Sequence, residues 1–179
     1  MNSDIRNILI REDEIKLKVA EVAGRITEDY TGRKLVLVGI LKGSIVFLAD
    51  LMRNIDLPLS VDFMSVSAYG IGASTPGDVK IIKDLDMPVE GKDVIIVEDI
   101  LDSGTTLSYI MDLMVVKKTA SIRLCALLDK PGRRRVPITP DYSCFTIPDE
   151  FVVGYGLDYS ERYRNLPYIG VLSREVYEK

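Results

Sequence analysis

The sequence predicts an α/β fold whose central sheet is mostly parallel and flanked by helices. Three apolar runs rich in β-branched residues have the composition of strands buried on both faces of a parallel sheet; they are Leu35–Ile40, Val94–Val97 and Ser121–Leu128. Each run is followed by a polar segment, and two of these segments lead into apolar residues at helical spacing. Strands that alternate with helices or crossovers in this way favour parallel pairing.

The first elements follow one another directly. Residues Glu12–Tyr30 carry apolar side chains at steps of three and four, which indicates an amphipathic helix, and Gly32 suits its end. The first buried strand comes next and leads, through a Lys-Gly pair, into a helix that extends to about Asn54. The beginning of the chain thus predicts helix, strand and helix.

The middle and the end of the chain add further strands. Leu59–Ala68 alternates as a strand, and Val79–Ile82 resumes strand character. Phe151–Tyr159 reads as a short strand and a turn that presents Asp158, and a final strand is expected around Tyr168–Leu172. Between the first two lies Tyr69–Asp78, which is rich in Gly, Ser, Thr and Pro and is predicted to be a mobile loop. This loop is either a surface hairpin or a lid over a reaction that water would spoil.

Length and composition fit one soluble domain. The chain has 179 residues, of which 47% are hydrophobic and 28% charged. Apolar runs stay short of the ~20 residues of a membrane span, and no secretory signal is expected at the beginning, so no membrane partner is predicted. Cys125 and Cys144 lie among apolar residues and are expected to be reduced core residues of a cytoplasmic protein.

The charged residues exclude several classes of function. Histidine is absent, which excludes Ser-His and Cys-His catalysis and leaves carboxylates as the natural bases. A net charge of −4 argues against general affinity for nucleic acid. The Arg133–Arg135 triplet is one basic cluster in this acidic chain, although such a triplet is more often a solvated face than a binding site.

The stretch from Val94 to Leu107 carries the strongest functional signal. Its buried strand is expected to end at Glu98 and Asp99, and a third acid, Asp102, opens the loop Asp102–Thr106 before a helix. A helix N-terminus suits a phosphate, while the acid pair is placed for Mg²⁺ or sugar hydroxyls. Ser103 as an ordinary N-cap would explain Ser103 and its glycine, but not three acids at one place.

A second anion site is predicted at the end of the first buried strand. Lys42 and Gly43 stand there, although Gly43 could merely begin the helix. The pair does not match the phosphate-binding pattern G-x-x-x-x-G-K-[ST].

The segment Glu98–Thr106, read Glu-Asp-Ile-Leu-Asp-Ser-Gly-Thr-Thr, resembles the 5-phosphoribosyl-1-pyrophosphate (PRPP) binding motif of type I phosphoribosyltransferases. Together with Leu41–Gly43, Leu128–Pro131 and Ile147–Pro167, it is similar to hypoxanthine-guanine phosphoribosyltransferases of the bacterial type. The resemblance implies one phosphoribosyltransferase domain over residues 1–179. Its core spans about 15–135, and a small hood is formed by the N-terminal segment and about 140–179.

The same resemblance implies an activity. A 5-phosphoribosyl group would pass from PRPP to N9 of hypoxanthine or guanine, giving IMP or GMP and pyrophosphate, with Mg²⁺ as the cofactor. Family members associate as dimers or tetramers, so a cytoplasmic homodimer or homotetramer is expected.

The resemblance also assigns roles on the PRPP side. Lys42, the Gly43 N–H and Arg164 would bind pyrophosphate; Ser103, Gly104, Thr105 and Thr106 would hold the 5-phosphate; Glu98 and Asp99 would hold ribose hydroxyls or metal; Asp102 would accept the proton near N7. The family joins the residues that match Leu41 and Lys42 by a cis peptide bond.

On the purine side, the resemblance implies that Lys130 donates to O6 and N7 and that Phe151 stacks on the ring. The Val152 main chain would contact the ring edge, and Asp158 would approach C2 and a second Mg²⁺. The loop departs from the family, because Ala68-Tyr69 replaces Ser-Tyr and a hydroxyl near pyrophosphate is lost, although Tyr69 remains. Thr105 replaces a residue that is often Leu or Lys, a change of detail.

Two alternatives stay open. One is a PRPP-sensing regulator that binds nucleic acid, which the Arg133–Arg135 triplet keeps alive. The acidic net charge, the lack of an added DNA-binding segment and the complete purine site argue against it. The other is a phosphoribosyltransferase for another base, such as xanthine or a pyrimidine.

Overall fold

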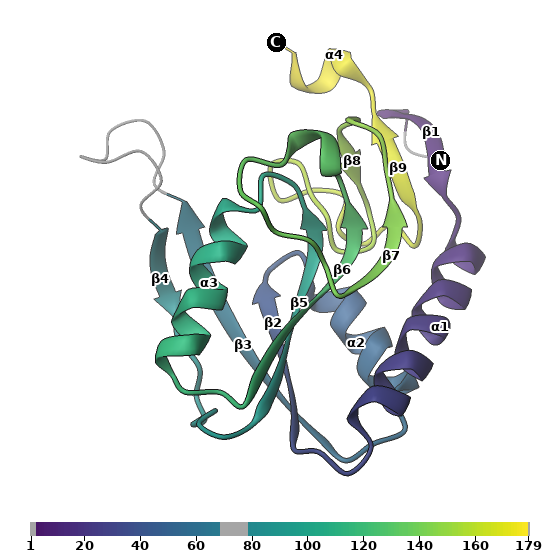
Figure 1. Ribbon diagram of the computed structural model, residues 1–179. Helices are drawn as coiled ribbons and strands as arrows, with labels where there is room; N and C mark the ends of the chain where they lie inside the picture. The colour runs from purple at the N-terminus through teal and green to yellow at the C-terminus, as the bar shows by residue number, and fades with distance from the viewer. Residues whose placement is uncertain (1–2, 69–78, 179) are drawn as a thin grey trace.

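The computed structural model describes residues 3–68 and 79–178, which form two sheets with flanking helices (Figure 1). The strands are β1 (Ile5–Ile10), β2 (Leu35–Leu41), β3 (Leu59–Ala68), β4 (Val79–Lys83), β5 (Asp93–Leu101), β6 (Ser121–Asp129), β7 (Tyr142–Thr146), β8 (Val152–Val153) and β9 (Ile169–Leu172). The helices are α1 (Glu12–Tyr30), α2 (Ile45–Asn54), α3 (Thr105–Val116) and α4 (Arg174–Tyr177), with a short 3₁₀ turn at Pro131–Arg133.

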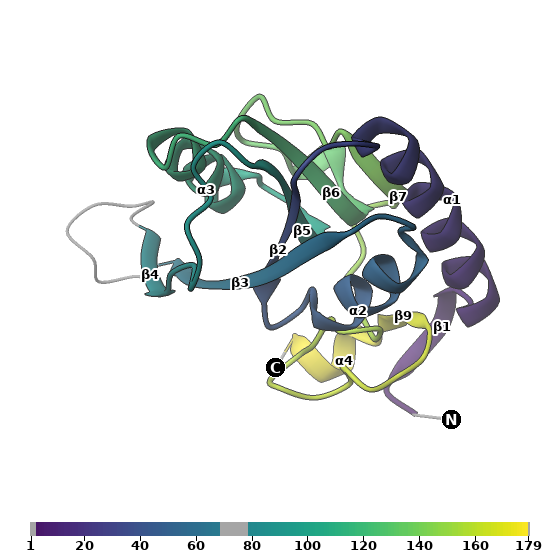
Figure 2. The ribbon, with the colours of Figure 1, turned by 90° about the horizontal axis from the view of Figure 1, so that it is seen from below.

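The larger sheet confirms the predicted fold class. Its strand order is β4-β3-β2-β5-β6-β7, and every pair is parallel except β3 with β4 at one edge. Helices α1 and α2 cover one face of this sheet and α3 covers the other (Figures 1 and 2). The predicted loop Tyr69–Asp78, including Tyr69, lies outside the described residues.

Side-chain alternation along the central strands builds one core on each face. In β2, Leu35 and Leu37 join the cluster under α1 and α2, while Val36 and Val38 join the cluster under α3. Successive residues of a strand point to opposite faces, so a strand covered on both sides needs apolar residues at every position. That requirement explains the uninterrupted apolar run.

The smaller sheet corresponds to the predicted hood. It is antiparallel, with strand order β1-β9-β8, so the N-terminal strand pairs with the C-terminal one. It lies above the carboxyl ends of the parallel strands (Figure 1). The Tyr155 hydroxyl, just after β8, donates to Asp50 Oδ2 of α2 at 2.5 Å and ties the hood to the larger sheet.

Strands β1 and β7 were not predicted from the sequence. In β1, Ile5 and Ile10 are buried but the residues between them are not, so neither strand nor helix periodicity is visible. β7 is a five-residue edge strand whose partner, β6, precedes it by a long loop. Both strands depend on pairing with segments that are not adjacent in sequence.

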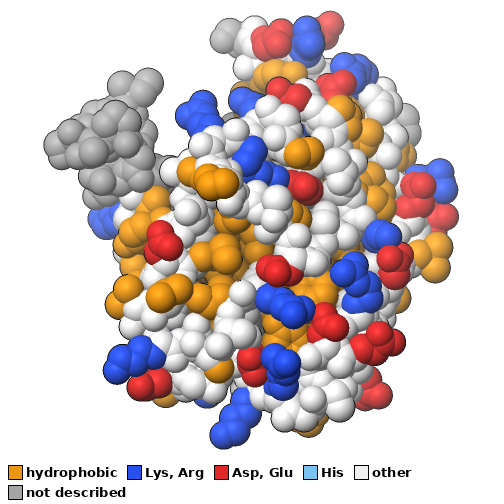
Figure 3. All heavy atoms as spheres, viewed as in Figure 1, with side chains coloured by type: hydrophobic (Ala, Val, Ile, Leu, Met, Phe, Trp, Pro, Cys, Tyr) orange, Lys and Arg blue, Asp and Glu red, His pale blue; other side chains and the backbone are white. Residues whose placement is uncertain are grey.

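The surface carries charges of both signs. On the face seen in Figure 3, acidic and basic side chains are interspersed, with hydrophobic patches between them. Within the described residues, no helix has the length and apolar character to cross a membrane.

Candidate functional site

Strand β5 continues through the acid pair. The prediction that the strand ends at Glu98 and Asp99 is wrong, because β5 extends to Leu101. Its pairing with β2 stops at Val97 with Gly39, whereas its pairing with β6 continues to Leu101 with Asp129. The residues of β5 after Val97 therefore have no pairing partner in β2, although β2 itself continues to Leu41, and their β2-facing edge is free to form a site.

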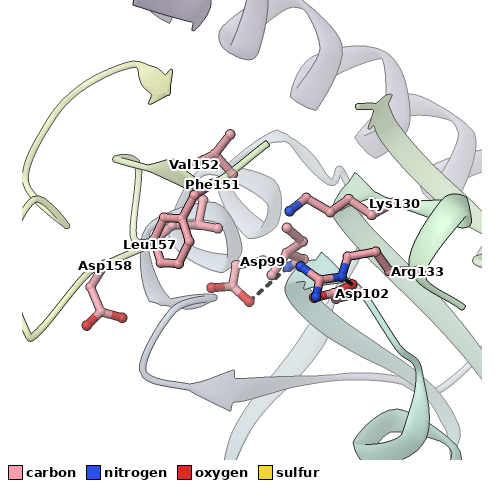
Figure 4. Close-up of a pocket in the computed structure, with 9 residues that line it drawn as sticks. Asp99, Asp102, Lys130, Arg133, Phe151, Val152, Leu157 and Asp158 are labelled. Atoms are coloured by element: carbon pink, nitrogen blue, oxygen red, sulfur yellow. Dashed lines mark hydrogen bonds and ion pairs between the residues drawn. The ribbon is translucent and has the colours of Figure 1, made fainter. Parts of the chain in front are cut away.

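Two adjoining cavities lie at this edge. The larger, of about 230 Å³, is lined by nine residues: Asp99, Ile100, Asp102, Lys130, Arg133, Phe151, Val152, Leu157 and Asp158 (Figure 4). The smaller, of about 110 Å³, is lined by Glu98, Ile100, Asp102, Ser103, Gly104, Thr106 and Leu107. Ile100 and Asp102 belong to both walls, so the cavities meet there.

The acid pair is divided between the two cavities. Glu98 and Asp99 are successive strand residues and point to opposite faces, so Glu98 lines the smaller cavity and Asp99 the larger. Burial and the neighbouring Asp99 carboxylate raise the pKa of Glu98 well above its usual value. Burial also raises the pKa of Asp99 to about 6, although the Ile100 N–H donates to Asp99 Oδ1 at 2.9 Å.

Two carboxylate oxygens at the site lack a hydrogen-bond donor. Glu98 Oε2 and Asp102 Oδ1 are buried and accept no hydrogen bond. The guanidinium of Arg133 lies beside Asp102, with Nε at 3.5 Å from Oδ1. Buried polar atoms are normally satisfied, so unpaired carboxylate oxygens in a cavity wall fit a ligand hydroxyl, a proton or a cation.

The loop from Asp102 to Thr106 forms the smaller cavity together with the start of α3. Gly104, not Ser103, is the N-cap of α3, and its φ of +81° is one that glycine adopts without strain. Ser103 and Thr106 line the cavity at a helix N-terminus, which suits a phosphate group. Thr105 begins α3 but does not line the described cavity.

Arg134 holds the loop Asp102–Thr106 in place through hydrogen bonds to the loop backbone and to the preceding residue. Its Nη1 donates to the Leu101 carbonyl at 3.0 Å and to the Asp102 carbonyl at 2.5 Å, and its Nη2 pairs with Asp129. The Arg135 N–H donates to the Ser103 carbonyl at 2.9 Å. The expectation of a solvated arginine triplet is therefore wrong for Arg134, whose side chain is 14% exposed, and Arg133 lines the larger cavity.

Gly43 allows three segments to meet closely. A Cβ at position 43 would lie 1.7 Å from Asp99 Oδ2, and a Cβ at Gly156 would lie 2.1 Å from the Gly43 carbonyl oxygen. Any larger residue at Gly43 would displace the carboxylate. The peptide bond between Leu41 and Lys42 is cis, as the resemblance implied.

The cations predicted for pyrophosphate lie close to this contact. Lys42 Nζ lies 3.1 Å from Glu161 Oε2, and Arg164 Nη2 lies 3.5 Å from the same oxygen. Arg164 also pairs with Asp158 Oδ1 at 2.9 Å and donates from Nη1 to the Gly156 carbonyl at 2.8 Å. Lys42 and Arg164, distant in sequence, thus share one exposed counter-ion, Glu161.

The larger cavity brings together the residues predicted for the purine. Figure 4 shows Lys130 on one side and Phe151 with Asp158 on the other. Lys130 is buried and donates to the Glu150 carbonyl at 2.6 Å, which leaves further ammonium protons for a ligand. Val152 lies in β8, and Phe151, just before it, is 38% exposed.

Sequence reasoning missed Arg134 and Glu161. Arg134 falls in a loop after β6 and contacts residues more than 30 positions earlier, and Glu161 contacts Lys42 across 119 positions. Within the sequence, the signal for Arg134 was its place in the arginine triplet that follows Lys130-Pro131-Gly132. Glu161 had no signal beyond lying between Asp158 and Arg164.

The chain matches known proteins along its length. Residues 7–160 match the phosphoribosyl transferase domain. Hypoxanthine-guanine phosphoribosyltransferases of Bacillus subtilis strain 168 and Staphylococcus epidermidis are 53% and 54% identical, over 99% and 100% of both chains. The bifunctional protein TilS/HprT of Listeria innocua is 54% identical over the whole chain, which spans 28% of that protein's length.

A solved structure shows the same fold. The hypoxanthine phosphoribosyltransferase of Staphylococcus aureus is 51% identical, with a TM-score of 0.95 and complete coverage of both chains. By family model, sequence and fold, the chain belongs to the hypoxanthine-guanine phosphoribosyltransferase family of phosphoribosyl transferase domains.

Proposed function

We propose that this chain transfers a 5-phosphoribosyl group from PRPP to N9 of hypoxanthine or guanine, with IMP or GMP and pyrophosphate as products. The observation that carries the proposal is the pair of cavities that meet at Ile100 and Asp102. A nucleotide has a phosphate at one end, a base at the other and a ribose between. The smaller cavity suits the phosphate, the larger suits the base, and the shared wall would face the ribose.

The residues fit a reaction that needs positioning more than a nucleophile. Positive charge would develop at the ribose anomeric carbon while negative charge grows on the departing pyrophosphate. Asp99 would face the ribose, and Lys42 and Arg164 would exchange Glu161 for pyrophosphate oxygens. Asp102 Oδ1, at the junction of the cavities, accepts no hydrogen bond although Arg133 lies beside it, and it can accept the N7 proton of the base.

The carboxylates also fit Mg²⁺. Within the described residues, no group of three or more His, Cys, Asp or Glu side chains could hold a metal by itself. Mg²⁺ is commonly bound through one or two carboxylates plus substrate oxygens, and Glu98 or Asp99, with Asp158 for a second ion, supply such ligands. The ion would supply charge neutralisation to the pyrophosphate.

Base choice follows from Lys130. Its ammonium would donate to the exocyclic O6 of hypoxanthine or guanine, whereas adenine presents an amino donor at that position. Two donors facing each other in a buried site leave both unsatisfied, at a cost of about 1–3 kcal/mol. The residues lining the larger cavity therefore favour 6-oxopurines.

Further parts of the proposal concern the whole molecule. We place the chain in the cytoplasm as a homodimer or homotetramer and treat residues 1–179 as one domain. The regulator alternative loses its basis in the structure, because Arg133 and Arg134 form ion pairs around the site instead of a free basic face. Xanthine stays an alternative base.

The proposed function is tested by incubating the chain with PRPP, Mg²⁺ and one base at a time. IMP and GMP should form with hypoxanthine and guanine, and chelation of Mg²⁺ should abolish product. Chromatography of the nucleotides is the measurement, with adenine as the negative control. Product from neither 6-oxopurine would reject the proposal.

The raised pKa of Asp99 predicts a pH-dependent stability in the absence of substrate. The folded protein keeps the Asp99 proton up to about pH 6, whereas the unfolded chain releases it near pH 4, so this group's stabilisation is lost as pH rises through that window. Asp99→Asn should remove much of this loss of stability. Urea unfolding from pH 4 to pH 8 measures the free energy of unfolding at each pH. Asp112→Asn, on the exposed side of α3, is the control, and parallel curves for wild type and Asp99→Asn would contradict the prediction.

Lys130→Met should raise the KM for hypoxanthine and guanine by about 5- to 150-fold, because the carbonyl of the base loses its buried donor. The KM for PRPP should stay within a factor of about two, since Lys130 lines the larger cavity and not the smaller one. Initial rates with each substrate varied in turn give both values, and Lys117→Met, at the C-cap of α3 and outside both cavities, controls for loss of a lysine. Equal losses for base and PRPP would remove Lys130 from base recognition.

Asp102→Asn should lower kcat by about 100-fold or more while sparing PRPP affinity, because an amide cannot accept the proton. Steady-state rates give kcat, and calorimetric titration with PRPP and Mg²⁺ gives the affinity. An unchanged kcat would show that Asp102 is not the base.

A further inference from the structure

Phe151 is part of an aromatic cluster that extends away from the site. Its ring stacks on Tyr177 of α4, with centroids 4.8 Å apart and planes inclined by 23°. Tyr159 meets the Phe151 ring edge-on, at 5.6 Å and 88°. Tyr159 and Tyr177 also touch each other edge-on, at 6.5 Å.

Tyr177 stacks on the Phe151 ring from outside the larger cavity. Phe151 lines the larger cavity, and Tyr177 does not. A ring has two faces, so a cavity-lining ring with one face stacked on an outside residue offers its other face to the cavity. Helix α4 accordingly lies at the outer edge of the smaller sheet (Figure 1).

The two ends of the chain hold Tyr177 in place. Val176 and Tyr177 pack against a buried cluster that includes Ile5 of β1 and Leu172 of β9. The Ser173 N–H, just before α4, donates to the Asp4 carbonyl at 2.8 Å. Tyr177 is therefore attached to the hood and does not project freely into solvent.

The backbone of Phe151 is fixed separately from its ring. The Phe151 carbonyl accepts a hydrogen bond from the Leu172 N–H at 2.9 Å, which leaves the side-chain torsions free. With 38% of the residue exposed, the ring's plane depends on its aromatic neighbours. Fixing that plane before a base arrives lowers the ordering cost of binding.

We propose that Tyr177 is a positioning residue for the purine: it holds the Phe151 ring so that the base becomes the third ring of a stack. The proposal rests on the proposed function, because it takes a purine as the ligand of the larger cavity. Tyr177 acts only through Phe151. Its effect is therefore confined to the base and spares PRPP.

The test compares full-length wild type, Tyr177→Ala and Tyr177→Phe in steady-state assays. Tyr177→Ala should raise the KM for hypoxanthine and guanine by about three- to tenfold, the range expected for losing one aromatic pair. The KM for PRPP should stay within a factor of about two. Tyr177→Phe should behave like wild type, because it keeps the stacking face and loses only the hydroxyl.

Arg174→Ala is the matched control, since Arg174 lies in the same short helix but is exposed. It should leave all three KM values unchanged, which separates loss of the ring from disturbance of α4. Melting curves of each variant show that it is folded.

A double-mutant cycle with Phe151→Leu tests whether Tyr177 acts through Phe151. Once Phe151 is removed, Tyr177→Ala should add no further increase in the KM for purine. Additive increases would overturn the proposal.

Other results would also overturn it. These are an unchanged purine KM in Tyr177→Ala, an equal rise for PRPP, or a loss in Tyr177→Phe as large as that in Tyr177→Ala. Failure of the wild type to use either purine would instead reject the proposed function, and this inference with it. An active wild type with unaffected variants rejects the inference alone.

Discussion

The site depends on the close contact between Gly43, Asp99 and Gly156. A Cβ at Gly43 would occupy nearly the position of an Asp99 carboxylate oxygen, and a Cβ at Gly156 would collide with the Gly43 carbonyl. The acid strand, the cation-bearing loop and the hood therefore touch through backbone and one carboxylate. Because interiors are close-packed, a methyl group at Gly156 would push the hood from the larger sheet, and one at Gly43 would displace the Asp99 carboxylate. The walls of the larger cavity come from these two bodies, so their separation sets its width.

Under the proposed function, the charges around this contact exchange their counter-ions for substrate. Strand alternation gives Glu98 to one cavity and Asp99 to the other, and burial raises the pKa of both. The cations Lys42 and Arg164 meanwhile share Glu161, which is exposed. Exposed ion pairs are worth little, so replacing Glu161 by a pyrophosphate with more charge and more oxygens costs the protein little. Burying the Glu98 and Asp99 carboxylates costs folding free energy, and a bound cation or ribose hydroxyls would reduce that cost.

Local sequence predicted the elements whose burial repeats along the chain. Helix α1 and strand β3 have the predicted bounds, because their apolar residues follow the helix and strand periods. Strand β1 was not predicted because only its two end residues are buried. Strand β5 extends beyond Glu98 and Asp99 because its pairing with β6 continues after the apolar run has ended. Motifs of consecutive residues led to the prediction of the loop Asp102–Thr106 and of Lys130 as site residues. Arg134 was misread because two of its partners, the Leu101 and Asp102 carbonyls, lie more than 30 positions earlier in the chain.

The division of labour follows from which segments build each cavity. The smaller cavity, proposed for the phosphate, comes from β5 and the start of α3, whereas the larger cavity, proposed for the base, adds the end of β6 and the segment around β8. The hood is closed by the chain's two ends, where the Tyr163 hydroxyl donates to Asp4 Oδ2 at 2.8 Å. Under the proposed function, substitutions in the hood therefore change base recognition without altering the loop Asp102–Thr106. Asp102 is the polar side chain that lines both cavities, so a ligand bound in one cavity affects the other most directly through Asp102.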